Sequence, residues 1–108
     1  MDAWVVQPHL YSGREDPKWE LGPNSVEEFL NYLSGCPADK DLPLLDSALG
    51  YRGVTVQHGG DSWQVFNGKI VHDDKGVKKI CRDEERQVER FLLSSRPDSI
   101  SMPKWASI

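Results

Sequence analysis

The sequence predicts a two-layer α+β domain in which two helices pack on one face of an antiparallel meander sheet. Hairpin turns recur through residues 50–81, with alternating apolar and polar residues between them. Two further segments each carry one apolar stripe at helical spacing. Helices with one apolar stripe and a sheet with one apolar face bury one another in two layers. The expected order of elements is β-α-β-β-β-β-α.

Residues 3–11 are expected to form the first strand. Trp4, Val6 and Leu10 alternate along it and fall on one face. Pro8 has no N–H to donate to a neighbouring strand. The first strand should therefore lie at an edge of the sheet or break at Pro8.

A first helix is expected over residues 25–34. Ser25 and Glu28 have the spacing of a capping box, in which each side chain bonds a backbone N–H at the other position. Gly35 stands where a left-handed residue commonly ends a helix, and Pro37 prevents continuation. The apolar stripe consists of Val26, Phe29, Leu30 and Leu33. Residues 36–49 then form a connector that leucines hold to the core.

Four strands and three turns are expected in residues 50–81. Gly59-Gly60 and Asn67-Gly68 suit two-residue hairpin loops, and the first of these places Asp61 opposite His58. Residues 73–76 suit a type I turn followed by a bulge at Gly76. The pairing that follows puts one aliphatic row on the helix-facing side, namely Val54, Val65, Ile70 and Ile80. The next row is Val56, Trp63, His72 and Lys78.

A second helix is expected to start near Asp83 and to end before Pro97. Its core-facing residues are Val88, Phe91 and Leu92. Arg86 and Glu89 are three positions apart and should pair on its surface. Residues 1–95 are thus expected to be one domain. Residues 96–108 form a C-terminal tail that should dock along the body, because a free tail rarely carries a Trp.

Composition excludes several classes of function. The chain has 108 residues and a net charge of −4, with Lys and Arg scattered and no basic stripe for nucleic acid. It has no apolar run of the ~20 residues needed to cross a membrane, and its N-terminus does not resemble a signal peptide. A cytoplasmic location is expected. The 2 cysteines, Cys36 and Cys81, share no metal-binding spacing and are expected to be buried or half-buried thiols. No cofactor is expected.

The segment Ser12–Leu21 is the best candidate for a functional loop. Gly13 permits backbone angles closed to other residues, and Pro17 fixes one. Shaped loops on a rigid scaffold commonly carry function. Arg14 and Arg52 could hold carboxylates in two parallel hydrogen bonds, as in a pocket for a small anion or an acidic peptide. The alternative is that Arg14 bonds Asp16 or a backbone carbonyl and only shapes the loop, and that Arg52 is a solvated strand residue.

The pattern S-G-R-x-D-P-x-W, followed by a helix and then by G-Y-R-G, resembles that of a group of small uncharacterised single-domain proteins. The carriers here are Ser12, Gly13, Arg14, Asp16, Pro17, Trp19, Gly50, Tyr51, Arg52 and Gly53. Glu15 stands where the resemblance implies Pro. The resemblance implies one domain over most of the chain, and it brings no activity with it.

The sequence favours binding over catalysis, with a protein or peptide as the partner. The expected contacts come from Arg14, Asp16, Trp19, Arg52 and Trp105, since Trp and Arg carry much of the energy at interfaces. If exposed, Trp19 or Trp105 would mark the interface; if buried, each only fastens its own segment. The oligomeric state stays open.

Two alternatives remain at this point. The first is a protein that binds a small anion or a metal ion, the metal being held by His58, Asp61 and His72. For these residues an ordinary turn pair and an edge histidine beside Trp63 are the simpler explanation. The second is a small hydrolase with acids and a histidine in one cleft, although no G-x-S-x-G motif is present.

Overall fold

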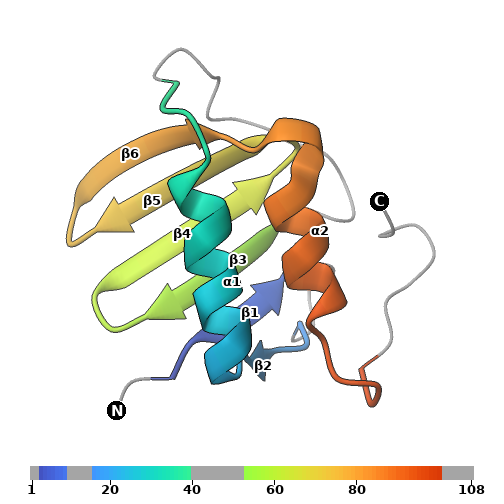
Figure 1. Cartoon of the computed structure of the whole chain (residues 1–108). Helices are drawn as coiled ribbons and strands as arrows, with labels where there is room; N and C mark the ends of the chain where they lie inside the picture. Colours follow the sequence, from blue (N-terminus) through green and yellow to red (C-terminus); the bar gives the residue numbers. More distant parts are fainter. Residues whose placement is uncertain (1–2, 10–15, 40–52, 101–108) are drawn as a thin grey trace.

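The structure is a computed structural model that describes residues 3–9, 16–39 and 53–100. These residues form a six-stranded antiparallel sheet in the order β2-β1-β3-β4-β5-β6 (Figure 1). The strands are β1 (Val5–Pro8), β2 (Trp19–Glu20), β3 (Val54–His58), β4 (Asp61–Phe66), β5 (Lys69–Asp74) and β6 (Val77–Arg82). The helical elements are α1 (Pro23–Ser34), the short 3-10 helix η1 (Glu84–Arg86) and α2 (Gln87–Ser94).

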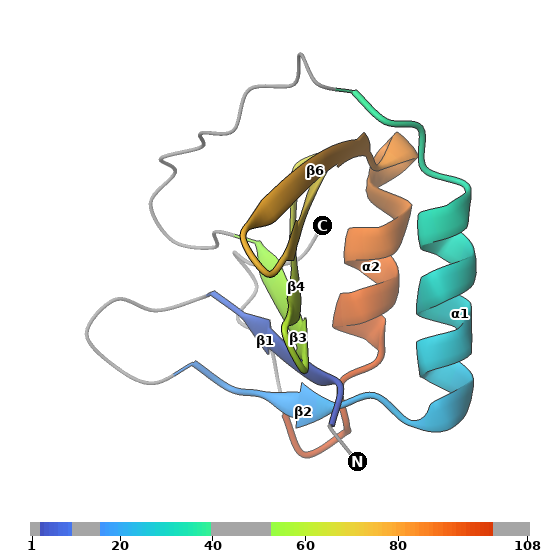
Figure 2. The same ribbon diagram turned by 90° about the vertical axis from the view of Figure 1, so that its left-hand side faces the viewer.

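Both helices cover the same face of the sheet (Figure 2). The predicted two-layer α+β architecture and the four-stranded meander β3–β6 are therefore confirmed. None of the helices in the described ranges is long and apolar enough to span a bilayer.

The first two hairpins of the meander have the predicted register. His58 pairs with Asp61 across Gly59-Gly60, and Phe66 pairs with Lys69 across Asn67-Gly68. Asn67 has φ 51° and Gly68 has φ 85°, so both loop positions are left-handed, as a tight hairpin requires. Alternation along these strands places Val54, Val65 and Ile70 in one row beneath the helices.

The predicted register of the third hairpin is wrong by one residue. Asp74 pairs directly with Val77, so Ile70 lies opposite Cys81, and Ile80 lies opposite Val71. A two-residue loop replaces the expected bulge, because Lys75 adopts φ 52° and Gly76 adopts φ 95°. This left-handed pair matches the twist of the strands, and the Asp73 carboxylate accepts the Gly76 N–H at 2.8 Å.

Because of this shift, each side chain of β6 lies on the opposite face of the sheet from the one predicted. Because successive side chains point to opposite sides of a strand, Ile80 faces away from the helices. Cys81 occupies the position beside the core that was predicted for Ile80. Lys79, and not Lys78, lies opposite His72. The predicted row of four aliphatic residues thus has a thiol at its outer end.

The strand β1 lies inside the sheet and not at an edge, but it ends at Pro8, which is the second of the two predicted alternatives. Val6 pairs with Val56 of β3 on one side and with Trp19 of β2 on the other. Pro8 still pairs with Val54, but it lies beyond the last pair between β1 and β2. Its missing N–H therefore interrupts no described ladder. The strand β2 has 2 residues and was not predicted, because so short a segment shows no period.

The capping box predicted for α1 is wrong. Gly22 is the N-cap residue and makes no side-chain cap, and Pro23 opens the helix. Proline is favoured there because its fixed φ is already helical and its missing N–H needs no partner. Ser25 consequently lies within the first turn. Gly35 ends the helix with φ −92° instead of the left-handed angle expected for it.

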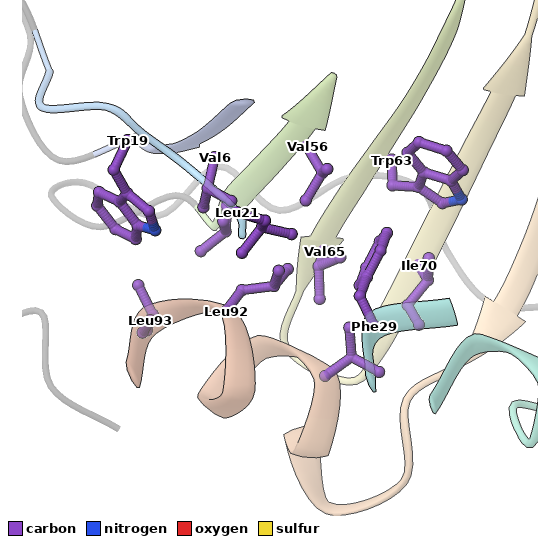
Figure 3. Packing of buried hydrophobic residues seen from close by; sticks show 12 residues of the cluster. Val6, Trp19, Leu21, Phe29, Val56, Trp63, Val65, Ile70, Leu92 and Leu93 are labelled. Carbon is purple, nitrogen blue, oxygen red and sulfur yellow. The ribbon is translucent and has the colours of Figure 1, made fainter. Parts of the chain in front are cut away.

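The core lies between the helices and the sheet (Figure 3). Phe29 of α1 is fully buried, and the ring of Trp63 lies 5.4 Å from it in an edge-to-face arrangement. Leu30, predicted to belong to the same stripe, is 44% exposed. The buried apolar residues are Val6, Trp19, Leu21, Phe29, Val54, Val56, Trp63, Val65, Ile70, Val88, Leu92 and Leu93.

Beyond α2 the chain still touches the core. Ile100 packs against the buried cluster from the segment that follows Pro97. Residues 101–108, with Trp105, lie outside the described part of the chain.

Candidate functional site

The clearest polar cluster lies where the segment between β1 and β2 joins the sheet. His9 directly follows β1, and Asp16 is the first described residue on the other side of that segment. The N–H of His9 donates a hydrogen bond of 2.8 Å to the carbonyl of Gly53. His9, at the end of one described range, therefore lies beside Gly53, at the start of another.

The ring of His9 lies between a hydroxyl and a carboxylate. Its Nε2 is 2.5 Å from Oγ1 of Thr55, and its Nδ1 is 3.8 Å from Oδ2 of Asp16. The His9 side chain is 31% exposed and that of Asp16 is 12% exposed, so the acid is the more buried partner. Thr55 is half-buried on β3. We call His9, Asp16 and Thr55 the loop-base cluster.

The loop-base cluster belongs to the face of the sheet opposite the helices. Val54 and Val56 are fully buried beneath the helices, so the side chain of Thr55 between them points the other way. Gln7 pairs with Thr55, and two residues further His9 follows on the same face. The cluster is thus separated from the core by the thickness of the sheet.

Gly53 allows the backbone to pass close to β4 at this place. Its φ is +97°, and a Cβ there would lie 2.7 Å from both the Phe66 Cβ and the Val65 carbonyl oxygen. No larger residue fits without moving the strand. Position 53 therefore requires glycine, and the carbonyl of this glycine accepts the His9 N–H.

Trp19 does not have the exposure that a partner contact requires. It is 6% exposed, and its indole Nε1 donates a hydrogen bond of 2.9 Å to Oγ of Ser95. Trp19 and Leu93 of α2 belong to the same buried cluster (Figure 3). The prediction that Trp19 contacts a partner is not supported, because its ring instead fastens β2 to the end of α2. Among the other predicted contacts, Asp16 is placed in the loop-base cluster, whereas Arg14, Arg52 and Trp105 lie outside the described residues.

The residues of the weak metal alternative do not converge. Nε2 of His72 lies 3.0 Å from Oδ1 of Asp61, but the ring of His58 stacks on Trp4 with centroids 3.9 Å apart. The hydrogen bond from His72 lowers the pKa of the Asp61 carboxyl below its usual value. In residues 3–9, 16–39 and 53–100, no group of three or more His, Cys, Asp or Glu side chains is placed to hold a metal ion.

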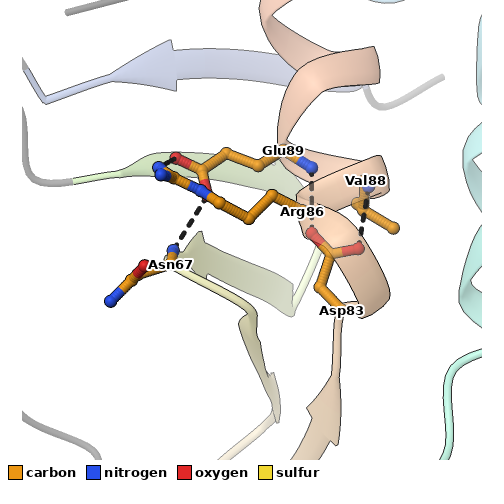
Figure 4. Close-up of polar contacts among 5 residues, drawn as sticks. All are labelled: Asn67, Asp83, Arg86, Val88 and Glu89. Atoms are coloured by element: carbon orange, nitrogen blue, oxygen red, sulfur yellow. Dashed lines mark hydrogen bonds and ion pairs between the residues drawn. The ribbon is translucent and has the colours of Figure 1, made fainter. Parts of the chain in front are cut away.

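A buried polar network joins the second hairpin to α2 (Figure 4). Asp83 is 2% exposed and accepts the backbone N–H groups of Val88 at 2.9 Å and Glu89 at 3.1 Å. Glu89 is fully buried and binds both the Arg86 guanidinium and the Asn67 N–H. Burial raises the pKa of Asp83, and the nearby Glu89 carboxylate adds to this effect. The network caps and positions α2.

The sequence predicted the Arg86–Glu89 pair of this network and missed its burial. Glu85 and Arg86 both adopt left-handed backbone angles, with φ 55° and 58°. These angles turn α2 so that Arg86 reaches Glu89 and Asp83 reaches the first free N–H groups of the helix. A charge pair at helical spacing gives no sign that one member is buried.

The two cysteines are free and half-buried, as predicted. Burial raises the pKa of the Cys36 thiol, and the carboxylate of Asp83 acts in the same direction. The Cys36 thiol donates to the carbonyl of Tyr32 at 3.2 Å. A thiol with a raised pKa is a poor nucleophile at neutral pH.

No family model, no curated protein and no solved structure matches this chain. The resemblance carried by the S-G-R-x-D-P-x-W pattern therefore stays a prediction. The loop-base cluster joins residues that are 46 positions apart, so no local spacing pattern could have identified it.

Proposed function

We propose that this protein is a small binding module that recognises a protein or peptide partner through the surface around residues 12–21. The observation that carries the proposal is the loop-base cluster, which gathers a histidine, a carboxylate and a hydroxyl at the foot of that segment. Polar groups that converge on one place of a rigid sheet are typical of recognition sites.

The position of the cluster supports a role for the two predicted arginines. Arg14 is two positions from Asp16, and Arg52 directly precedes Gly53, whose carbonyl binds His9. Both arginines are therefore joined by short lengths of chain to the same end of the sheet. A guanidinium group binds a carboxylate through two parallel hydrogen bonds. We infer that the partner offers Asp, Glu or a C-terminal carboxylate.

A peptide selection followed by affinity measurements tests this proposal. Random peptides are selected on the immobilised protein, and the dissociation constants of the enriched peptides are measured by fluorescence anisotropy. Enriched peptides should carry an acidic residue, and Arg14→Ala or Arg52→Ala should weaken binding about tenfold or more, the effect of losing a bidentate contact. Arg90→Ala removes an exposed arginine from α2 and serves as the matched control.

Two results would contradict the proposal. Enriched peptides without acidic residues would show that the protein does not recognise a carboxylate. Equal losses of affinity in the Arg14, Arg52 and Arg90 variants would show that net charge, and not this surface, determines binding.

A further inference from the structure

The geometry points to an acyl-transfer site at the loop-base cluster, with Thr55 as nucleophile, His9 as general base and Asp16 as the residue that positions His9. The substrate class is an ester of a small carboxylic acid. This inference does not rest on the proposed peptide partner, since a small ester reports on the site by itself.

The three side chains have the order that nucleophilic catalysis by a hydroxyl requires. A hydroxyl is a weak nucleophile until a base takes its proton, and the base needs a third group to orient it. Here Oγ1 of Thr55 lies 2.5 Å from Nε2 of His9, and the Asp16 carboxylate faces Nδ1 on the opposite side of the ring. The carboxylate favours the imidazole proton on Nδ1, which leaves Nε2 to accept the hydroxyl proton.

The exposed fractions suit these roles. The Asp16 side chain is 12% exposed and that of His9 is 31% exposed, so the base is more open to solvent than the acid that positions it; Thr55 is half-buried. The distance of 3.8 Å between His9 and Asp16 is longer than a hydrogen bond. Contacts of this kind are commonly loose without substrate and tighten when it binds.

The scaffold holds the base and the nucleophile in place. The His9 N–H is bonded to the Gly53 carbonyl at 2.8 Å, and a Cβ at position 53 would lie only 2.7 Å from atoms of β4, so the chain passes close to β4 there. Thr55 is paired with Gln7 in the ladder between β1 and β3. Thr55 thus lies on β3, and His9 directly follows the adjacent strand β1 and is held to Gly53 by its backbone, which is a firmer support than an unattached loop.

The reaction balances with the residues present. Oγ1 of Thr55 attacks the ester carbonyl carbon while its proton moves to Nε2 of His9. The bond between this carbon and the leaving oxygen then breaks, and the leaving oxygen takes that proton. Water hydrolyses the acyl-Thr55 ester in a second step, giving one proton to His9, which returns it to Oγ1. Asp16 touches no reacting atom, and its charge stabilises the imidazolium that forms in each step.

The test uses 4-nitrophenyl acetate and follows two readouts. Absorbance measures release of 4-nitrophenolate, and fragmentation mass spectrometry of the acylated protein locates the acetyl group. We expect the acetyl group on Thr55. Thr55→Val and His9→Gln should lower the rate about 100-fold, the size of a general-base contribution. Thr55→Ser keeps the hydroxyl and should retain the rate.

The chain contains its own control for simple imidazole chemistry. His72 also lies beside a carboxylate, Asp61, with its Nε2 3.0 Å from Oδ1, but it belongs to the helix-facing side of the sheet. His72→Gln should leave the rate unchanged. Asp16→Asn should lower kcat, leave KM unchanged and move the lower limb of the pH–rate profile, which a purely structural role would not do.

Two outcomes would overturn the inference. One is an acetyl group that is found on lysine or on His72 of the wild-type protein and not on Thr55. This result does not depend on the folding of any variant. The other is a Thr55→Val protein that melts like the wild type and hydrolyses the ester equally fast. Either would leave the Thr55–His9 bond as a structural tie between β1 and β3.

Discussion

The indole N–H of Trp19 donates a hydrogen bond to the hydroxyl of Ser95, and these residues lie 76 positions apart in the chain. The bond joins the short edge strand β2 to the C-cap residue of α2. Ser95 also donates to the carbonyl of Leu92, so its hydroxyl serves both the helix end and the tryptophan.

A double-mutant cycle on this pair should show coupling. Trp19→Phe keeps an aromatic ring and loses the donor, and Ser95→Ala loses the acceptor. We expect a coupling energy of about 0.5–1.5 kcal/mol in urea unfolding, the net value of a hydrogen bond in a protein. Ser94→Ala, which alters the exposed neighbouring serine, is the control. Additive effects of the two changes would mean that the bond does not stabilise the fold.

The raised pKa of Asp83 should make the protein less stable as the pH rises, which is the opposite of the usual effect of a carboxyl group. The folded state holds the Asp83 proton more tightly than the unfolded chain does, since burial raises the pKa from 3.8. The folded state thus binds more protons in the window that opens near pH 3.8 and extends upward to the folded pKa. Stability due to this group falls as the pH rises through that window.

The measurement for Asp83 is the unfolding free energy of wild type and Asp83→Asn as a function of pH. The difference, variant minus wild type, should increase across the window because the variant buries no charge. Carboxyls that do not interact with Asp83 cancel in this difference. An NMR titration of Asp83 with its midpoint at or below 3.8 would contradict the prediction.

The contact between Asp61 and His72 should be visible in the titration of the carboxyl. Its pKa is lowered, first by the hydrogen bond from His72, so its NMR midpoint should lie below 3.8. The contact stabilises the fold above pH 3.8, and this contribution is lost as the pH falls through the lower folded pKa. His72→Gln should move the midpoint upward. His58→Gln should not, because the His58 ring stacks on Trp4.

Cys36 should react slowly with alkylating reagents. Its thiol pKa is raised above 9.0 by burial first and by Asp83 next, so little thiolate is present near pH 8. In a Cys81→Ser protein, iodoacetamide should modify the folded chain more slowly than the guanidinium-unfolded chain. Adding Asp83→Asn should increase the folded rate. Equal rates in the folded and unfolded chains would refute the shift.

The loop of the third hairpin should be sensitive to a Cβ at one glycine. Gly76 has φ +95°, where a side chain is strained although no atom lies within 4 Å of it. Gly76→Ala should cost about 1–2 kcal/mol in unfolding free energy. Gly35→Ala should be neutral or slightly stabilising, since Gly35 has φ −92° and its added Cβ meets the Tyr32 oxygen at an ordinary 3.7 Å.

Local turn chemistry accounts for most of the fold that could be predicted. Gly59-Gly60 and Asn67-Gly68 each admit one compact hairpin, so the register of β3, β4 and β5 follows from the sequence. Residues 73–76 admit two loops that differ by one residue. The choice between these two loops depends on the twist of the strands and on the hydrogen bond that the Asp73 carboxylate accepts from Gly76. The alternation of apolar and polar residues carries no information about either.

The candidate site was predictable only in part. Arg14 and Asp16 stand out because no periodic element explains them, and Asp16 does lie in the loop-base cluster. His9 and Thr55 fall within predicted strands, and no local motif links them. Their meeting depends on β1 entering the sheet between β2 and β3, a pairing across 46 positions that no local motif encodes.

The place of β1 also has a consequence for how the chain is made. Its longer ladder is with β3, so during synthesis β1 has to wait until β3 follows it. At ~5–20 residues per second this delay is on the order of several seconds. Until then the ladder between β1 and β3 cannot form, so a nascent chain paused before residue 54 would lack the pairing that places β1 inside the sheet.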